Sequence, residues 1–442
     1  MAMTAVQTKR LLATQIQKNR KRLLDWQEAI ARDNPPPFYC SIDLRDSGHK
    51  IVPVDSNLYP AGFNNICPDD MRTAPQVLRL RLAKMWPDQI PQKVIIIPEA
   101  HTQNAYYWEN IHYLTQILRE AGLETRVGWY GPLPEGMLSP FVLKSATDKS
   151  VEIHELKIEG GILSASGFVP DFVLLNNDFS SGYPELLDAV RQPIVPSHAL
   201  GWHSRKKSEH FLYYNRLAAE FATIAEFDPW LIQIDTEEVR PVNFNEDEGI
   251  EEVAQSVERI IARSKEAYQT HGVEQEPFVF VKNNAGTYGM GIMVVHSGDE
   301  LRQMNRRTKN KMSVGKNKLP IGSVAVQEGV PTSTLVDRLA AEPVIYLMGD
   351  ELIGGFLRTN SQKGIEDNLN SQGMVFRKLC MSDLKRPTLD RGDDADTDEA
   401  PDSDEPDMEL VYGSVARISA LATGMELKAH PPLSVPARAA QG

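Results

Sequence analysis

Hydrophobic positions recur at two different periods along the chain. Residues 4–32 carry leucine and isoleucine near helical spacing, which predicts one long helix in an N-terminal segment of residues 1–35. The prolines at 35–37 end that helix, because proline cannot donate to the helical hydrogen-bond ladder. Beyond this point, short apolar runs of the kind found in strands alternate with amphipathic segments.

The first long stretch has the rhythm of strands joined by helices. Val94–Ile97 and Phe172–Leu175 are continuous apolar runs, typical of strands buried on both faces of a parallel sheet. Residues 106–121 between them are helical in pattern and end before Gly122, a common helix terminator. This βαβ pattern predicts an open α/β domain over residues 36–240.

The next stretch begins with one helix and continues with short strands. The helix pattern of residues 248–271 closes at Gly272. Strand candidates follow at residues 278–282, 324–328, 344–348 and 352–358. Gly349 and Asp350 separate the last two, which favours a hairpin. Residues 241–387 are therefore predicted to form an α+β domain with more antiparallel sheet.

Acidic residues are concentrated near the end of the chain. Eleven of them, against one basic residue, lie between Asp390 and Glu409, so this stretch supplies about −10 of the net charge of −13. Residues 388–408 have too few apolar side chains to offset their ordering entropy and are predicted to be a disordered, dispensable insertion. Residues 409–442 are predicted to return as a helix and tail. The near-neutral remainder gives no electrostatic basis for nucleic-acid binding.

Other features favour a cytoplasmic protein. No apolar run of about 18 residues is present, so no membrane span is expected. The basic N-terminus lacks the apolar core of a secretory signal. Cys40, Cys67 and Cys380 are widely spaced without a CxxC pair, which predicts buried thiols in a reducing compartment. The oligomeric state stays open, a homo-oligomer included.

The most informative segment runs from a predicted strand into a glycine-rich loop. A lysine ends the strand and three glycines follow, which would let backbone N–H groups approach phosphate oxygens. A P-loop needs its lysine after the glycines, and the dinucleotide fingerprint has a different glycine order. A flap over a phosphate chain is predicted, with a purely structural turn as the alternative. The candidate nucleotide contacts here are Lys282, Gly286, Thr287, Tyr288, Gly289 and Gly291.

Polar groups at later strand ends extend the predicted site. Gln327, Glu328 and Val330 end one strand and are candidates for contacts with adenine and ribose. Arg358 ends another strand, where a guanidinium can hold a phosphoryl group with two hydrogen bonds.

A pair of asparagines follows this arginine. Asn368 and Asn370 stand two apart, so their side-chain carbonyls would point to one side of an extended chain and could complete the shell of Mg²⁺. A loop of turn residues is the alternative interpretation.

Taken in order, these segments resemble the arrangement of ATP-grasp enzymes such as bacterial glutathione synthetase. A closer resemblance is to the ATP-grasp type of bacterial glutamate–cysteine ligase, and it covers about residues 38–385. The blocks that carry it are D-S-N-L-Y-P-A-G-F-N-N at 55–65, P-E-A-H-T-Q-N at 98–104, L-N-N-D at 175–178, the segment 200–211, K-N-N-A-G-T-Y-G-M-G-I-M at 282–293 and V-Q-E-G-V at 326–330.

The resemblance implies a fold and a reaction. The fold would be α/β: an ATP-grasp fold with an N-terminal open, pre-ATP-grasp-like domain and a C-terminal α+β nucleotide-binding domain. The reaction would join the γ-carboxylate of L-glutamate to the amine of L-cysteine through γ-glutamyl phosphate, the first step of glutathione biosynthesis. ATP and Mg²⁺ would be required, with Lys282 and Arg358 as catalytic residues. A late Glu-x-Asn motif is missing, so the predicted metal ligands are Glu342, Asn368 and Asn370.

Two amino-acid substrates would need a pocket of mixed charge. Polar residues near apolar strand ends are the candidates, because ligands of α/β folds sit at the carboxyl ends of strands. They are Arg45, Asp55, Asn57, Asn64, Asn65, Asn177, Asp178, Arg205 and Lys206. The spacing of His101, His203 and His210 suits no common metal motif and favours hydrogen-bonded histidines. Another ATP-grasp ligase, or a non-catalytic ATP-binding protein, is the alternative.

Overall fold

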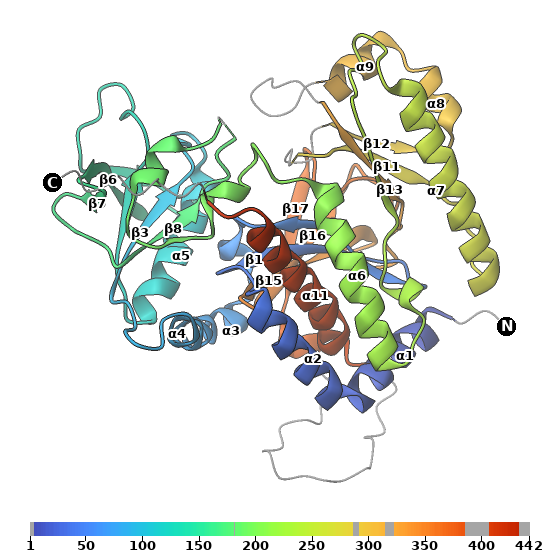
Figure 1. The fold of residues 1–442 in the computed structure, drawn as a ribbon, viewed down its shortest axis with the longest axis horizontal. Coiled ribbons are helices and arrows are strands. Elements are labelled where there is room, and N and C mark those ends of the chain that lie inside the picture. The colour runs from blue at the N-terminus through green and yellow to red at the C-terminus, as the bar shows by residue number, and fades with distance from the viewer. Residues whose placement is uncertain (1–3, 181, 286–290, 314–321, 385–405, 433–442) are drawn as a thin grey trace, which may run out of the picture.

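The computed structural model describes residues 4–180, 182–285, 291–313, 322–384 and 406–432. It is a mixed α/β protein built on three sheets (Figure 1). The predicted acidic insertion, residues 388–408, falls almost entirely outside the described residues.

The central six-stranded sheet joins distant parts of the chain, which the sequence patterns did not predict. Its order is β17-β16-β15-β1-β2, with the short β14 beside β15. The hairpin predicted at Gly349-Asp350 connects β15 and β16, and Gly349 adopts φ 65°, which suits glycine. Strand pairing therefore crosses the domain boundary predicted at residue 240. Its strands are β1 (Cys40–Asp46), β2 (Ile51–Asn57), β14 (Leu335–Val336), β15 (Leu339–Met348), β16 (Glu351–Asn360) and β17 (Met374–Leu379).

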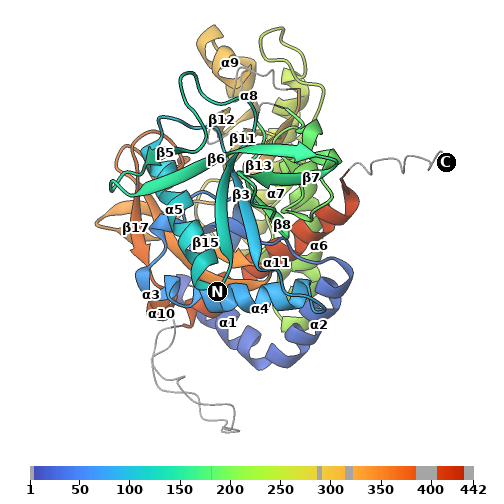
Figure 2. The same ribbon diagram turned by 90° about the vertical axis from the view of Figure 1, so that its left-hand side faces the viewer.

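A seven-stranded sheet confirms the predicted βαβ rhythm. Strands β6, β4, β3, β8 and β9 run parallel to one another, and the apolar runs Val94–Ile97 of β3 and Phe172–Leu175 of β8 are buried as expected. Pro184 is followed by a short 3-10 helix, η2 (Glu185–Ala189). The strands face the viewer in Figure 2. They are β3 (Lys93–Pro98), β4 (Glu124–Trp129), β5 (Phe141–Lys144), β6 (Ser150–Glu159), β7 (Ile162–Ala165), β8 (Phe172–Asn176) and β9 (Ile194–Val195), with helices α3 (Pro68–Met71), α4 (Ala74–Met85) and α5 (Ala105–Glu120).

The third sheet has four antiparallel strands in the order β10-β13-β11-β12. Helix α7 packs its apolar stripe against this sheet and ends at Gly272, whose φ of 66° confirms the predicted glycine cap. The elements are β10 (Thr236–Val239), β11 (Val279–Asn283), β12 (Ile292–Val295), β13 (Val324–Glu328), α7 (Ile250–His271), α8 (Gly298–Arg302) and α9 (Arg306–Ser313).

Four helices cover one face of the central sheet and bury the largest apolar core (Figure 1). They are α1 (Ala5–Lys18), α2 (Arg20–Asp33), α6 (Lys207–Ala225) and α11 (Met408–Ala429); the remaining short helices are η1 (Phe63–Asn65), η3 (His198–Leu200), η4 (Pro229–Leu231) and α10 (Met381–Leu384). The predicted C-terminal helix is confirmed as α11.

The single N-terminal helix predicted from the sequence is wrong, because α1 and α2 break at Asn19. The side-chain amide of Asn19 donates to the backbone carbonyls of Gln15 at 3.2 Å and Ala225 at 3.1 Å. This buried hydrogen bond to the end of α6 stabilises the kink. The apolar spacing of residues 4–32 does not predict it. None of the described helices combines the length and apolar character that a bilayer crossing requires.

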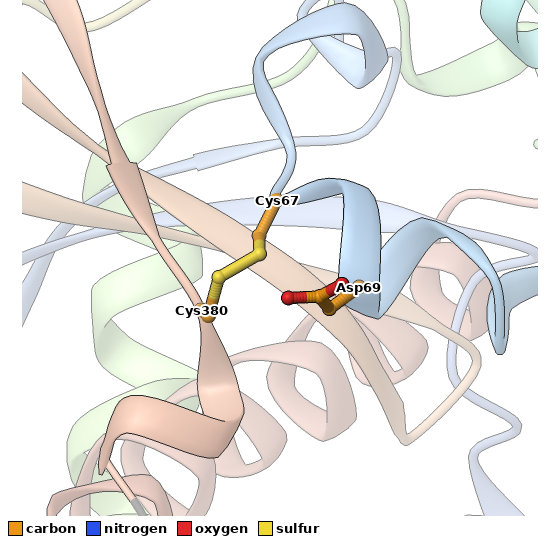
Figure 3. A group of neighbouring side chains, drawn as sticks. All are labelled: Cys67, Asp69 and Cys380. Carbon is orange, nitrogen blue, oxygen red and sulfur yellow. A yellow bond between two sulfur atoms is a disulfide. The ribbon is translucent and has the colours of Figure 1, made fainter.

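The expectation of three thiols is also wrong, since Cys67 and Cys380 form a disulfide (Figure 3). The pair joins residues 313 positions apart, so only the tertiary contact between the start of α3 and the end of β17 brings them together. Asp69 lies beside them, but both sulfur atoms are in the disulfide and offer no thiolate to a metal. Cys40 stays a buried free thiol.

Removing this disulfide should lower stability by about 2–5 kcal/mol, because the cross-link closes a long loop in the unfolded chain. The measurement is the urea midpoint of a variant with both Cys67→Ser and Cys380→Ser, compared with the wild type with and without a reducing agent. Reduced wild type should match the variant. Equal midpoints for oxidised and reduced wild type would contradict the expectation.

Candidate active site

Two adjoining cavities lie where the three sheets meet. The larger has a volume of about 810 Å³ and the smaller about 50 Å³. Four residues line both, and they mark the junction: Asp55, Lys207, Arg358 and Asn370. The smaller cavity lies between the central sheet and strands β11 and β12 of the four-stranded sheet.

A buried cluster of opposite charges forms one wall of the smaller cavity. Arg358 Nη1 donates to Asp43 Oδ2 and to Glu342 Oε1, both at 2.7 Å. Arg45 Nε donates to Glu342 Oε2 at 2.8 Å. The strand register explains the meeting, because Glu342 on β15 lies directly opposite Arg358 on β16. Two guanidinium groups thus balance two carboxylates in a site nearly closed to water.

The pKa values of the two carboxylates move in opposite directions. Burial acts to raise the pKa of Glu342, but the positive charges of Arg45 and Arg358 together lower it. Burial raises the pKa of Asp43, and the single partner Arg358 only partly offsets that effect. Asp43 is therefore the less well compensated of the two.

Asp43 is a residue that the sequence reasoning missed. Its Oδ1 has no hydrogen-bond partner among the described residues, and neither has Nε of Arg358. An orphaned buried carboxylate oxygen fits a cation, and oxygen ligands from carboxylates and amides are those that Mg²⁺ prefers. Asn368 and Asn370 line the same cavity. One sequence signal was available: charged residues alternate with apolar ones inside the buried strand around Asp43.

Lys282 lies on the opposite wall of the smaller cavity, and its side chain contacts Gln327. Lys282 Nζ donates to Gln327 Oε1 at 2.6 Å and to the carbonyl of Val54 at 3.1 Å. Burial lowers the pKa of this lysine to about 7, and the neighbouring ammonium of Lys207 acts in the same direction. Gly291 adopts φ 61° and its carbonyl accepts from Asn283 N at 3.0 Å. The predicted contacts Gly286, Thr287, Tyr288 and Gly289 lie outside the described residues.

Two predicted nucleotide contacts lie away from both cavities. Glu328 points to the other face of β13, where both its oxygens accept from Lys50 Nζ at 2.9 Å and one accepts from Asp235 N at 3.2 Å. Val330 is buried, with its carbonyl 3.4 Å from Arg45 Nη1. Since successive side chains of a strand alternate, Gln327 and Glu328 cannot face one ligand together.

The larger cavity gathers most of the predicted substrate residues. The residues that line it are Asp55, Asn57, Asn64, Asn65, Asp178, Arg205 and Lys206. Arg45 lines the smaller cavity instead. Asn177 lines neither, because its side chain donates to Pro98 O at the end of β3 at 2.9 Å and accepts from Phe179 N at 2.8 Å.

Arg205 is held by the C-terminal helix. Its Nη2 donates to Glu426 Oε2 of α11 at 2.8 Å, and its Nη1 donates to Ser56 O at 2.6 Å. Burial opposes ionisation of Glu426, but Arg205 and His210 hold its pKa at about 2. The predicted substrate contact Arg205 is therefore largely occupied in bracing β2 against α11.

The lysine at the junction is Lys207, which the sequence reasoning passed over in favour of Lys206. Lys207 Nζ pairs with Asp55, a residue shared by both cavities. Lys206 Nζ instead lies 3.6 Å from Glu238. Nothing in a run of two lysines distinguishes them; the start of α6 at Lys207 sets which one points inward.

The three histidines have different surroundings. His210 is buried with Nδ1 3.1 Å from Glu426 and Nε2 2.9 Å from Ser419 Oγ, which confirms the expectation of a satisfied histidine. His203 Nε2 lies 3.2 Å from the carbonyl of His198. His101 lines the larger cavity, half-exposed, with Nε2 2.6 Å from Glu99 Oε2.

Lysine, arginine and buried carboxylates around the smaller cavity, next to the larger one, form a charged site suited to binding phosphate. The model of the family GshA, glutamate–cysteine ligase, matches residues 13–427, so the chain belongs to the glutamate–cysteine ligase family. That family's reaction uses ATP as a substrate.

Solved structures include a similar protein. A crystal structure described as a gamma-glutamylcysteine synthetase from Methylobacillus flagellatus KT is 35% identical, covers 97% of this chain and 98% of that chain, and has a TM-score of 0.83. A glutathione synthetase-like effector from Globodera pallida is 12% identical over 80% of this chain and 75% of its own, with a TM-score of 0.34, too low to support an argument. Among curated proteins, none matches this chain.

Proposed function

We propose that this ligase is of the ATP-grasp type and joins the γ-carboxylate of L-glutamate to the amine of L-cysteine through γ-glutamyl phosphate. The observation that carries the proposal is the junction of the two cavities. Arg358, Lys207 and Asn370 line both the smaller cavity, between two antiparallel sheets, and the larger cavity. A phosphoryl donor in one and an acceptor carboxylate in the other would meet there.

The smaller cavity suits the phosphate end of ATP. Lys282 on β11 and the arginines on β1 and β16 supply positive charge from opposite walls. Phosphoryl transfer depends on such positioning and charge stabilisation more than on covalent chemistry by the protein. Nε of Arg358, without a partner among the described residues, is available to the transferred group.

The carboxylates and amides of this cavity would hold Mg²⁺. Asp43, Glu342, Asn368 and Asn370 are the residues that fit, the first through its orphaned Oδ1. Asp43 on the N-terminal strand β1 would take the place of the carboxylate of the missing Glu-x-Asn motif. When bound, Mg²⁺ supplies charge neutralisation on the phosphates.

Both amino acids fit the larger cavity. Its lining mixes amides, carboxylates and cations, as an ammonium and several carboxylates require. Activated glutamate is sensitive to water, so a site enclosed by three sheets protects it until the amine arrives.

The test is ADP release from MgATP with L-glutamate, with and without L-cysteine. Turnover that needs both amino acids supports the proposal. Turnover with a different amine would make the chain another ligase of the same kind, and nucleotide binding without turnover on any amine would favour a non-catalytic ATP-binding protein.

ATP binding should depend on pH through Lys282. The free protein holds this lysine mostly neutral above its pKa of about 7, whereas bound phosphates favour the ammonium. Binding above that pH must therefore take up about one proton, and affinity should fall up to about tenfold per pH unit. Calorimetry at pH 8 in two buffers of different ionisation heat measures the uptake. The Lys282→Met variant should show none; equal uptake in variant and wild type would contradict the assignment.

A further inference from the structure

A histidine–carboxylate pair lies at the larger cavity and outside the lining of the smaller one. His101 and Glu99 follow β3 at the carboxyl edge of the seven-stranded sheet, and His101 lines the larger cavity but not the smaller. His101 Nε2 lies 2.6 Å from Glu99 Oε2. Glu99 itself is buried, with 7% of its surface exposed.

The pair is fixed in place by helix α5. Tyr107 Oη accepts from Glu99 N at 2.8 Å, and the Tyr107 ring packs edge-on against the His101 ring with centroids 5.3 Å apart. Trp108 Nε1 donates to the carbonyl of His101 at 2.6 Å. These three contacts with α5 hold the loop and keep the imidazole in one orientation, which proton transfer requires.

The short contact with Glu99 determines which nitrogen carries the proton. A carboxylate only accepts, so Nε2 must carry the hydrogen, and in the neutral ring Nδ1 is then the basic nitrogen. No hydrogen bond to Nδ1 is found within the described part of the chain. A carboxylate behind one imidazole nitrogen and a free basic nitrogen in front is the arrangement that prepares a histidine as a general base.

Four other titratable residues of the larger cavity have hydrogen-bond or ion-pair partners of their own. Both ring nitrogens of His210 are bonded, and Arg205 is paired with Glu426. Lys207 is paired with Asp55 at the junction, and Asp178 Oδ1 accepts from Ser180 N at 3.0 Å. The groups that face His101 are Glu99 from its own loop and the Tyr107 ring from α5.

We propose that His101, oriented by Glu99, is the general base for the acceptor amine, an inference that rests on the proposed function. A protonated ammonium has no lone pair with which to attack. One proton of that ammonium is therefore first passed to water through His101 Nδ1. The free amine nitrogen then bonds the γ-carbonyl carbon of γ-glutamyl phosphate, the bond from that carbon to the phosphate oxygen breaks, and the second proton leaving nitrogen passes to His101 Nδ1. Inorganic phosphate leaves, and His101 returns its proton to water.

Hydroxylamine tests this role, because it is largely unprotonated near neutral pH and attacks acyl phosphates without a base. His101→Asn should lower γ-glutamylcysteine formation by about 10²-fold or more. Formation of γ-glutamyl hydroxamate from MgATP, glutamate and hydroxylamine should stay near the wild-type rate, which also shows that the variant is folded. His112→Asn on α5, outside both cavities, is the matched control and should leave both reactions unchanged.

Glu99→Gln provides a second, milder variant. Loss of the carboxylate should destabilise the protonated imidazole, so the acid limb of the cysteine pH profile should move to lower pH while turnover falls. Equal losses of both reactions in His101→Asn, or retained cysteine ligation, would overturn the inference. A wild-type enzyme that forms no hydroxamate from glutamate would instead overturn the proposed function.

Discussion

Replacing Arg358 with lysine is expected to lower γ-glutamylcysteine formation about 10³-fold, at the lower end of what arginines contribute to phosphoryl transfer. A lysine keeps the positive charge between Asp43 and Glu342 but loses the planar fork that can bind two carboxylates and a phosphoryl group at once. Alanine would be a poorer test, because it leaves the buried carboxylate of Asp43 without its arginine, a loss that costs about 3–5 kcal/mol and endangers the fold.

The measurements for Arg358→Lys are turnover with both amino acids and the Kd of MgATP. Arg377→Lys is the matched control: Arg377 lies on the neighbouring strand β17, half-exposed and 3.7 Å from Asp337. It should behave as the wild type. If the turnover of Arg358→Lys stayed within tenfold of the wild type, a role of this arginine in stabilising the transition state would be contradicted.

The second large effect is expected from Asp43→Asn. The substitution keeps the shape of the side chain but removes the charge that an orphaned oxygen offers to a cation. We expect the Mg²⁺ concentration for half-maximal activity to rise, and activity at fixed Mg²⁺ to fall, by about 10²-fold. Activity as a function of Mg²⁺ concentration at saturating ATP is the measurement.

Asp46→Asn separates a metal effect from a loss of stability. Asp46 is an equally buried carboxylate on the same strand, paired with Lys9 at 2.7 Å, and it lines neither cavity. Its replacement should leave the Mg²⁺ requirement unchanged even if the protein unfolds more easily. The same Mg²⁺ requirement in Asp43→Asn and wild type would contradict the assignment of Asp43.

Local patterns predicted the local structure well, because they act through neighbours in the chain. The apolar runs at β3 and β8, the hairpin at Gly349 and the cap at Gly272 all follow from residue type within a few positions. The kink at Asn19 does not follow from nearby residue types, because it is stabilised by a hydrogen bond to the end of α6, 206 positions away.

Long-range pairing explains most of the other differences. Strand β1 pairs with β15 of the predicted second domain, and this brings Asp43 into a site that was sought only in later residues. The disulfide of Cys67 with Cys380 and the support of Arg205 by Glu426 have the same origin. Sequence spacing alone carries no information about such contacts.

Other site predictions depended on which way a side chain points. Lys282 and Arg358 line the smaller cavity and Gln327 contacts Lys282, and each of the three lies within or ends an apolar strand in a recognisable motif. Glu328 shares the motif of Gln327 but faces Lys50, which follows from strand alternation once β13 is placed. The domain boundaries and the remaining ligand assignments stay predictions.

The central claim is that glutamate is activated as an acyl phosphate in this site, and oxygen transfer tests it most directly. L-Glutamate labelled with ¹⁸O in its γ-carboxylate is incubated with MgATP, L-cysteine and the enzyme, and the released phosphate is analysed by mass spectrometry. We predict one labelled oxygen in the phosphate for each γ-glutamylcysteine formed. Unlabelled phosphate accompanying the same product would contradict the account.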